Sequence, residues 1–294
     1  MFTNFIQRAY ADGAEFVTGA DLARRIESFV ASDITIRQDG DKIVATATGG
    51  DLGKFALDVE TSQQIASVDN WYAFDGTKVF LPKNGGTFAI ALGSGPADVT
   101  RIAELPMRAE LLSASGDGTN LEFALSGRGA VKVDLKAWGA NSVVTSGADG
   151  GSLAGEMLTL SLANLGAHSV KIDYVGANLV AGTAGNDVIV AANEGRTIDG
   201  GLGNDHLIGG GGADTFVYRL GGGVDTVQGF TAADDKILLI GTAFASAQDA
   251  LAQFFQDAAG ATLSFSETDR LVLANTALNQ LQAEHILLGD TLVA

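Results

Sequence analysis

The sequence predicts a mostly β fold, and three observations lead to this class. Short runs of alternating apolar and polar residues, separated by turn-forming clusters, fill residues 1–175 and predict an antiparallel β domain. Residues 176–240 are rich in glycine and repeat with a period of nine residues. Residues 241–294 lose most of this glycine and predict a small mixed cap. We therefore expect three domains with these boundaries.

The composition narrows the classes of function. The chain of 294 residues has 35 acidic and 18 basic residues, which gives a net charge of −17. This balance argues against binding to nucleic acid or to an anionic membrane, because both rely on clusters of Lys and Arg. Cysteine is absent, which excludes disulfides, thiolate metal ligands and cysteine nucleophiles. No run of 18 apolar residues occurs, so we expect no membrane-spanning helix.

One helix and a series of strands are predicted in the first domain. Leu22, Ile26, Phe29 and Val30 share one helical face, and Thr18 or Asp21 could cap this helix. The period-two runs predict strands at 34–38, 42–48, 54–60, 78–82 and 87–92. In the cap, a helix is expected at 246–258 and strands at 261–266 and 270–276.

The glycine-rich stretch is an array of nine-residue units. In order, the units read GTAGNDVIV (182–190), AANEGRTID (191–199), GGLGNDHLI (200–208), GGGGADTFV (209–217) and a degenerate YRLGGGVDT (218–226). Position six holds Asp187, Arg196, Asp205, Asp214 and Gly223, and position eight is apolar in the first four units. The second unit keeps its length although it has lost its Asp, which indicates that a stacked geometry fixes the register.

The unit itself indicates what such a stack would bind. Six residues rich in Gly form a turn, and the next three form a short strand with one apolar side chain pointing inward. Two units make one coil, so a turn stacks on the turn that lies two units further along. Carboxylate and backbone oxygens then converge between coils, and oxygen ligands without nitrogen or sulfur favour Ca²⁺.

The units resemble the GGxGxDxUx nonapeptide of calcium-binding RTX (hemolysin-type) proteins. The segment VDTVQGFTAADDKILL (224–239) also resembles the one that closes an RTX roll. The resemblance implies a parallel β-roll of calcium-binding nonapeptide repeats, with Ca²⁺ held between turns. Carried over by position, Asp187 and Asp205 would surround one ion, Asp225 would complete a second, and Asp214 would face Asn193 and Glu194. The glycines of the implied metal sites are Gly185, Gly200, Gly203, Gly209 and Gly212.

The same resemblance implies a route of export. RTX proteins leave Gram-negative bacteria through a type I secretion exporter, directed by an uncleaved C-terminal signal, and the start of this sequence does not resemble a cleavable signal. We therefore expect an extracellular or cell-surface protein whose export signal lies in 241–294.

His206, at the variable position seven of a repeat, is expected to face solvent.

No catalytic signature stands out in residues 1–175. The sequence has neither an HExxH motif nor a GxSxG nucleophile elbow, so we favour a non-enzymatic surface, matrix or glycan-binding protein. A secreted polysaccharide lyase or hydrolase with an unrecognised site in 1–175 is the alternative, since such an enzyme needs only two carboxylates. Trp71 and Tyr72 could form a platform for a sugar ring, although the more common role of such aromatic residues is to fill the core of a β domain.

Overall fold

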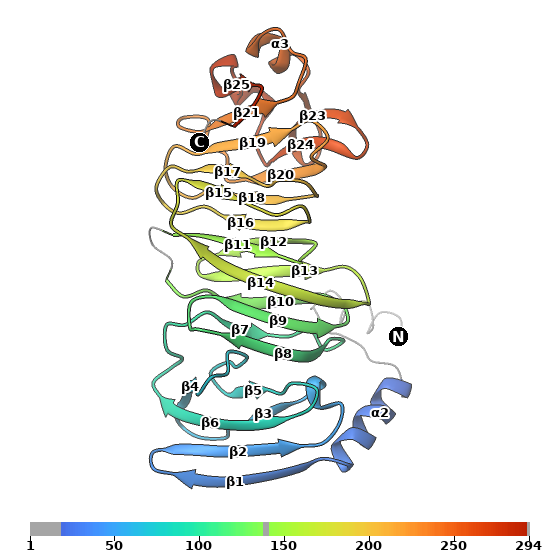
Figure 1. Cartoon of the computed structure of the whole chain (residues 1–294), viewed down its shortest axis with the longest axis vertical. Coiled ribbons are helices and arrows are strands. Elements are labelled where there is room, and N and C mark those ends of the chain that lie inside the picture. Colours follow the sequence, from blue (N-terminus) through green and yellow to red (C-terminus); the bar gives the residue numbers. More distant parts are fainter. Residues whose placement is uncertain (1–18, 138–140, 293–294) are drawn as a thin grey trace, which may run out of the picture. The chain divides into compact units, whose positions relative to one another are not determined.

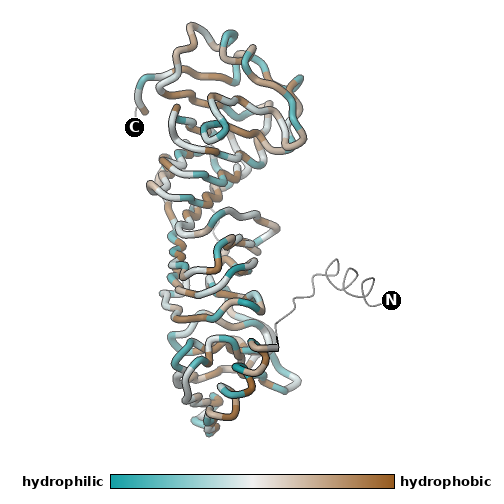
Figure 2. The backbone as a smooth tube through the Cα atoms, turned by 90° about the vertical axis from the view of Figure 1, so that its right-hand side faces the viewer, coloured by the Kyte–Doolittle hydropathy of each residue, from teal (hydrophilic) through white to brown (hydrophobic). Residues whose placement is uncertain are grey.

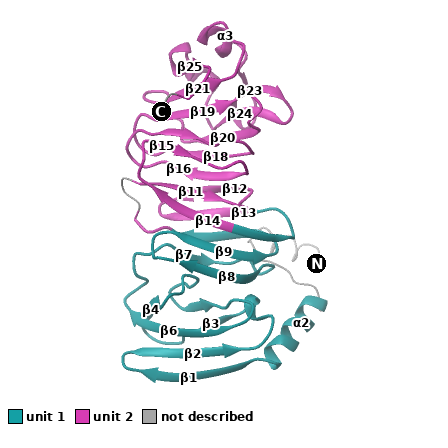
Figure 3. Cartoon of the chain, viewed as in Figure 1, with its two compact units in different colours: residues 1–134, 162–169 teal, residues 135–161, 170–294 magenta. Residues whose placement is uncertain are grey.

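The computed structural model describes residues 19–137 and 141–292 and is mostly β, with 49% strand and 9% helix. The expected fold class is therefore confirmed at this level. The chain forms two compact units, residues 1–134 with 162–169 and residues 135–161 with 170–294 (Figure 3). The three-part division of the sequence remains a prediction.

The described part of unit 1 begins with the expected helix, α2, and continues as short strands (Figure 1). Its elements are α2 (Gly19–Val30), β1 (Asp33–Asp39), β2 (Lys42–Thr48), η1 (Leu52–Lys54), β3 (Ala56–Asp58), β4 (Gln64–Val68), β5 (Lys78–Phe80), β6 (Gly86–Gly93), β7 (Arg101–Glu104), β8 (Glu110–Gly116), β9 (Leu121–Ser126) and β10 (Gly129–Asp134). Each predicted strand overlaps an observed one, although the strand expected over 54–60 is reduced to the three residues of β3.

The strand pairs of unit 1 are antiparallel, as expected. β1, β2, β6 and β4 form one sheet in that order, while β3 pairs with β5, β7 with β10, and β8 with β9. Alternate side chains of β2, β4 and β6 enter a core that includes Ile65, Phe74, Val79 and Ile90, each at most 1% exposed. This core follows from the period-two pattern of the sequence.

Unit 2 contains the repeats and the C-terminal region. Its elements are β11 (Ser142–Ser146), β12 (Gly150–Ala154), β13 (Met157–Leu162), β14 (Ala167–Val175), β15 (Leu179–Ala181), β16 (Asp187–Val190), β17 (Thr197–Asp199), β18 (His206–Ile208), β19 (Thr215–Arg219), β20 (Val224–Gln228), β21 (Lys236–Ile240), α3 (Ala247–Leu251), β22 (Phe255–Gln256), β23 (Gly260–Ser266), β24 (Asp269–Ala274), η2 (Leu278–Gln280), η3 (Ala283–His285) and β25 (Ile286–Gly289).

The repeats form a parallel roll whose strands alternate between two sheets (Figure 1). β16, β18, β20 and β24 pair in parallel in one sheet, and β15, β17, β19, β21 and β25 pair in parallel in the other. Ile189 lies beside Leu207 and Ile198 beside Phe216, which is the offset of eighteen residues that two nine-residue units predict. The position-eight residues of the repeat strands are apolar and buried, and the hydropathy colouring shows apolar segments interspersed with polar ones along the backbone (Figure 2).

The core of unit 2 runs between the two sheets of the roll. The position-eight residues Ile189, Ile198, Leu207 and Phe216 are at most 1% exposed and belong to one apolar cluster. Leu263, Leu271 and Ile286 of the C-terminal strands join the same cluster. The C-terminal strands therefore extend the roll rather than form a separate core.

The helix expected over 246–258 is shorter than predicted. It is capped by Ser246, whose side chain accepts a hydrogen bond from the Asp249 backbone N–H, but it ends at Leu251. Asp257 then accepts hydrogen bonds from the backbone N–H groups of Ala259 and Gly260, which forms the turn of the β22–β23 hairpin. Within the described residues, no helix is both long and apolar enough to cross a bilayer.

Candidate metal centre

Three buried aspartates are stacked along one edge of the roll. The backbone N–H of Asp187 donates to Oδ1 of Asp205 at 2.9 Å, and the N–H of Asp205 donates to Oδ1 of Asp225 at 3.1 Å. The three residues are at most 3% exposed. The stacking order is the expected one, and the two-residue delay of Asp225 is accommodated in the turn before β20. We call Asp187, Asp205 and Asp225 the first column.

A second column follows the opposite edge of the roll. The N–H of Arg196 donates to Oδ1 of Asp214 at 2.8 Å, and the N–H of Asp214 donates to Oδ1 of Asp235 at 2.9 Å. Asp214 therefore faces the degenerate turn 191–196 on one side, as expected, and a further carboxylate on the other. Asp235 was not predicted, because it follows Asp214 by twenty-one residues and the repeat predicts eighteen. Its segment DKIL (235–238) nevertheless has the same pattern as DTFV (214–217), an aspartate followed by a short strand.

Each intact repeat leaves one carboxylate oxygen buried without a hydrogen bond. These atoms are Oδ1 of Asp187, Oδ2 of Asp205 and Oδ2 of Asp214, none of which has a hydrogen-bond partner among the described residues. A buried anionic oxygen without a partner is costly, since nothing replaces the water it has lost. A hard cation would satisfy these oxygens, so the aspartates of the roll fit Ca²⁺.

The electrostatics of both columns lead to the same conclusion. Burial raises the pKa of Asp205 to about 7, and the charges of Asp225, Asp187 and Asp199 act in the same direction. Burial likewise raises the pKa of Asp225 to about 6 and raises the pKa values of Asp187 and Asp214. Burial makes the ionised form of these carboxyl groups unfavourable, and a cation bound beside them would stabilise that form.

Backbone groups complete each turn. A Cβ added to Gly200 would lie 2.2 Å from Oδ2 of Asp205, so the carboxylate occupies the space of a side chain at the first position of its own repeat. Gly203 has a φ of +116°, and a Cβ there would lie 2.6 Å from the carbonyl oxygen of Gly185 in the turn stacked on it. Gly200 thus leaves room for the carboxylate of its own repeat, and Gly203 lets two stacked turns approach each other closely.

The side chains alone do not make a complete coordination shell. Across residues 19–137 and 141–292, no group of three or more His, Cys, Asp or Glu side chains is placed to hold a metal ion. Ca²⁺ takes six to eight oxygen ligands, and backbone carbonyls are common among them. The ligand set that fits this geometry is therefore a few aspartates together with backbone carbonyls. Gly209 is half-buried in its turn, whereas Gly185 and Gly212 are exposed at turn tips.

Asparagines and a threonine add hydrogen bonds that the sequence reasoning did not include. Oδ1 of Asn186 accepts from the N–H of Asn204 at 2.8 Å, and Oδ1 of Asn204 accepts from the N–H of Val224 at 2.8 Å. Thr183 donates to Oδ2 of Asp187 through its backbone N–H and its hydroxyl. The Asn at position five of the repeat is the signal that could have predicted this ladder.

His206 does not face solvent as expected. It is half-buried, and a Cβ added to Gly150 would lie 2.7 Å from its Nε2, so the ring packs against the backbone of β12. Burial lowers the pKa of this histidine. The expectation failed because the strands that cover the variable position of the repeat come from outside the repeat array.

Trp71 and Tyr72 are both half-buried in unit 1. The Trp71 indole N–H donates to the carbonyls of Ala73 and Phe80, each at 3.0 Å, and its ring packs edge-on against Phe88 with 5.5 Å between centroids. These contacts place Trp71 beside the core of unit 1. The ring of Tyr72 lies 3.1 Å from the position of a Cβ on Gly116.

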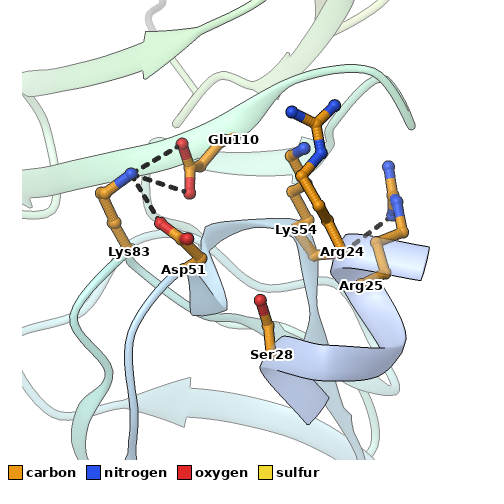
Figure 4. A pocket seen from close by; sticks show the side chains of 7 residues that line it. All are labelled: Arg24, Arg25, Ser28, Asp51, Lys54, Lys83 and Glu110. Carbon is orange, nitrogen blue, oxygen red and sulfur yellow. Dashed lines mark hydrogen bonds and ion pairs between the residues drawn. The ribbon is translucent and has the colours of Figure 1, made fainter. Parts of the chain in front are cut away.

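A charged pocket of about 190 Å³ also lies in unit 1 (Figure 4). Its lining residues are Arg24, Arg25, Ser28, Asp51, Lys54, Lys83 and Glu110. Lys83 pairs with both acids, at 2.7 Å from Oδ1 of Asp51 and 3.2 Å from Oε2 of Glu110. The hydrogen bond from Lys83 lowers the pKa of Asp51, whereas a glycosidase acid requires a raised pKa.

The comparisons with known proteins concern the roll. The profile of the RTX calcium-binding nonapeptide repeat family matches four copies over residues 174–193 and 197–227. These residues carry both the stacked turns and four of the aspartates of the two columns. No curated protein matches the chain. The repeats of this family bind Ca²⁺. The chain therefore carries RTX calcium-binding nonapeptide repeats, which lie in unit 2, and Ca²⁺ is the cofactor that these repeats bind.

Proposed function

We propose that this protein is an extracellular calcium-binding protein whose roll folds when it meets calcium outside the cell. The observation that carries the proposal is the set of buried carboxylate oxygens of Asp187, Asp205 and Asp214, which have no hydrogen-bond partner among the described residues. Bound Ca²⁺ would supply the positive charge that these oxygens need. Without it, the ionised aspartates stacked in this segment repel one another, which favours the unfolded chain.

In the proposed roll, backbone N–H groups orient the aspartate carboxylates and the carboxylates bind the ion. Asp205 and Asp214 each accept a backbone N–H from the neighbouring turn through Oδ1, and their Oδ2 atoms are buried without a hydrogen-bond partner among the described residues. The ladder thus orients the carboxylates before binding, so that less ordering remains to be done when the ion arrives. We expect dissociation constants of about 10⁻⁴–10⁻³ M, as in other extracellular modules. Such affinity leaves the roll empty in a low-calcium cytosol.

Calorimetric titration of the full chain with CaCl₂ tests this proposal. The wild-type protein should bind several Ca²⁺ ions, whereas Mg²⁺ at the same concentrations should produce little heat because it dehydrates reluctantly. Asp205→Asn should lose sites, and Asp41→Asn, an exposed position in the β1–β2 turn, should titrate like the wild type. Identical titrations of the two variants would contradict the proposal.

We further propose that residues 241–294 carry the signal for a type I exporter. β24 pairs with β20 and β25 pairs with β21, so deleting 241–294 also removes strands that continue the two sheets of the roll. A loss of secretion on deletion would therefore not separate a missing signal from degradation. Fusing 241–294 to an unrelated passenger and assaying the medium beside a type I exporter makes the separation, and a passenger retained in the cell would contradict this role.

For unit 1 we propose a non-enzymatic role at a surface, in a matrix or on a glycan, with Trp71 and Tyr72 as the candidate platform. Tyr72 is the better residue to test, because Trp71 donates two hydrogen bonds to the backbone and its loss would disturb the core. A glycan array probed with the calcium-loaded chain and with Tyr72→Leu should show binding that the variant loses. Cleavage of an arrayed glycan would instead support the enzymatic alternative.

A further inference from the structure

Arg196 stands where the neighbouring repeats have aspartate. Asn178, Arg196 and Asp214 occupy equivalent positions in successive coils, since the carbonyl of Asn178 accepts from the N–H of Thr197 just as the carbonyl of Arg196 accepts from the N–H of Thr215. β15 and β17 keep the same offset of eighteen residues. The degenerate unit has therefore kept its place in the second column while the charge at position six has changed sign.

The side chain of Arg196 is folded into the roll. It is only 5% exposed, although arginine at a turn of a β structure is usually solvated. Its Nη1 lies 3.4 Å from Oδ1 of Asn178 in the preceding coil and 3.4 Å from the carbonyl oxygen of Gly195 in its own turn. Its Nη2 lies 3.3 Å from Oε2 of Glu194. The guanidinium is thus surrounded by amide, carbonyl and carboxylate oxygens, which are the donor types that a calcium ion takes.

The charge of Arg196 also acts on the next turn of the column. Its backbone N–H donates to Asp214, and its positive charge opposes the effect of burial on the pKa of that carboxyl. A buried cation is stable only where oxygens replace its water, and here the oxygens come from two successive coils. The guanidinium therefore bridges neighbouring turns, as a bound ion would.

We infer that the guanidinium of Arg196 takes the place of a calcium ion at turn 191–196, so that this step of the stack carries its own positive charge and binds no calcium. The inference rests on the proposed function only in that calcium occupies the other turns. It makes the two edges of the roll unequal. The first column, with Asp187, Asp205 and Asp225, depends on calcium at every step, whereas the second column has one permanent cation.

Three substitutions of the full chain separate the charge of Arg196 from its bulk. Arg196→Asp restores the position-six aspartate of the intact repeats, Arg196→Gln removes the positive charge, and Arg196→Lys keeps it. Each protein is titrated with CaCl₂, with the number of bound ions taken from calorimetry and the calcium midpoint of folding from near-UV circular dichroism.

We expect Arg196→Asp to bind one more Ca²⁺ ion per chain than the wild type. Arg196→Gln should bind the wild-type number but need several-fold more calcium to fold, because the oxygens around position 196 lose their cation. Arg196→Lys should fold at a calcium midpoint much closer to that of the wild type. This order is not expected of an arginine that serves only as packing, since glutamine and lysine would then raise the midpoint alike.

Two results would overturn the inference. One is an Arg196→Asp protein that is folded in calcium yet binds no additional ion. The other is an equal calcium midpoint for the wild type, Arg196→Gln and Arg196→Lys, which decides the matter even if Arg196→Asp fails to fold. A wild-type chain that binds no calcium would refute the proposed function instead. Thermal unfolding would then still test the inference, which expects Arg196→Gln to melt below Arg196→Lys.

Discussion

The carboxylate of Asp205 accepts the backbone N–H of Asp187, eighteen residues earlier in the chain, at 2.9 Å. This one bond joins two successive coils of the roll and fixes the direction of the Asp205 side chain. Its second oxygen is consequently held inside the turn, where no described residue donates to it. The side chain that binds the coils together is thus the same one that creates the need for a cation.

The two columns should respond differently to the loss of their central aspartate. Asp205 lies between two carboxylates of the first column, whereas Asp214 has one carboxylate neighbour, Asp235, and one arginine. Asp205→Ala should therefore reduce the number of bound Ca²⁺ ions more than Asp214→Ala. Calorimetric titration of both variants measures the difference. Equal losses, or a larger loss for Asp214→Ala, would show that the assignment of ions to the two edges is wrong.

Gly200→Ala should destabilise the calcium-loaded roll by about 2 kcal/mol or more. The added Cβ would lie 2.2 Å from Oδ2 of Asp205 and would displace the carboxylate from its turn. Gly211→Ala is the matched control, since the nearest atoms to its Cβ lie at 3.9 Å. Thermal unfolding in saturating calcium should lower the Tm of the first variant by several degrees and leave that of the second near wild type. Similar Tm values would contradict the tight packing described.

Acid should partly replace calcium. The pKa of Asp205 is about 7 in the folded chain against 3.8 for the ordinary side chain, and that of Asp225 is about 6. Between pH 4 and pH 7 the folded state therefore binds more protons than the unfolded state, so that stability falls as the pH rises. The loss of stability caused by ionising these buried carboxyl groups is absent below about pH 4 and complete above about pH 7.

The calcium-free protein should accordingly be more folded at pH 5 than at pH 7.5. Near-UV circular dichroism of resin-decalcified protein at the two pH values measures this, and thermal melts should show a Tm at least about 5 °C higher at pH 5. Asp205→Asn, which cannot ionise, should narrow the gap. A calcium-free fold that is more stable at pH 7.5 would mean that these carboxyl groups are not buried as described.

The ion pair of Arg219 and Asp199 should stabilise the roll independently of calcium. Nη2 of Arg219 lies 2.5 Å from Oδ2 of Asp199, whose side chain is 11% exposed. Because Asp199 also raises the pKa values of Asp205 and Asp225, the arginine neutralises a carboxylate that would otherwise add to the repulsion. A double-mutant cycle with Arg219→Gln and Asp199→Asn in saturating calcium should give a coupling energy of about 1 kcal/mol. If the two substitutions change the free energy of unfolding additively, the ion pair does not stabilise the roll.

Features with a strict period were predictable from the sequence. The offset of eighteen residues between stacked turns follows from two nine-residue units, and it places Asp187 beside Asp205 and Ile189 beside Leu207. Asp235 escaped this reasoning because three additional residues separate it from the register. A search for the pattern of an aspartate followed by a strand, with insertions allowed, would have found it.

Features set by contacts between distant segments were not predictable. The sequence shows that Arg196 replaces an aspartate, but only the structure shows its guanidinium folded between coils rather than pointing into solvent. The burial of His206 depends in the same way on Gly150, which lies outside the repeats. The short helix ending at Leu251 reflects competition from the hairpin that follows it, which a helical periodicity does not report.

Hydrogen exchange of the full chain, with and without calcium at pH 7.5, tests the central claim most directly. The backbone N–H groups of Asp187, Asp205 and Asp214 donate to stacked carboxylates, so they report on the coils themselves. The account predicts that peptides covering 182–240 exchange rapidly in EGTA and become protected in millimolar Ca²⁺, while Mg²⁺ has little effect. Peptides of β2 and β6 serve as the internal control and should not change. Equal protection of 182–240 in EGTA and in Ca²⁺ would contradict the claim that calcium folds the roll.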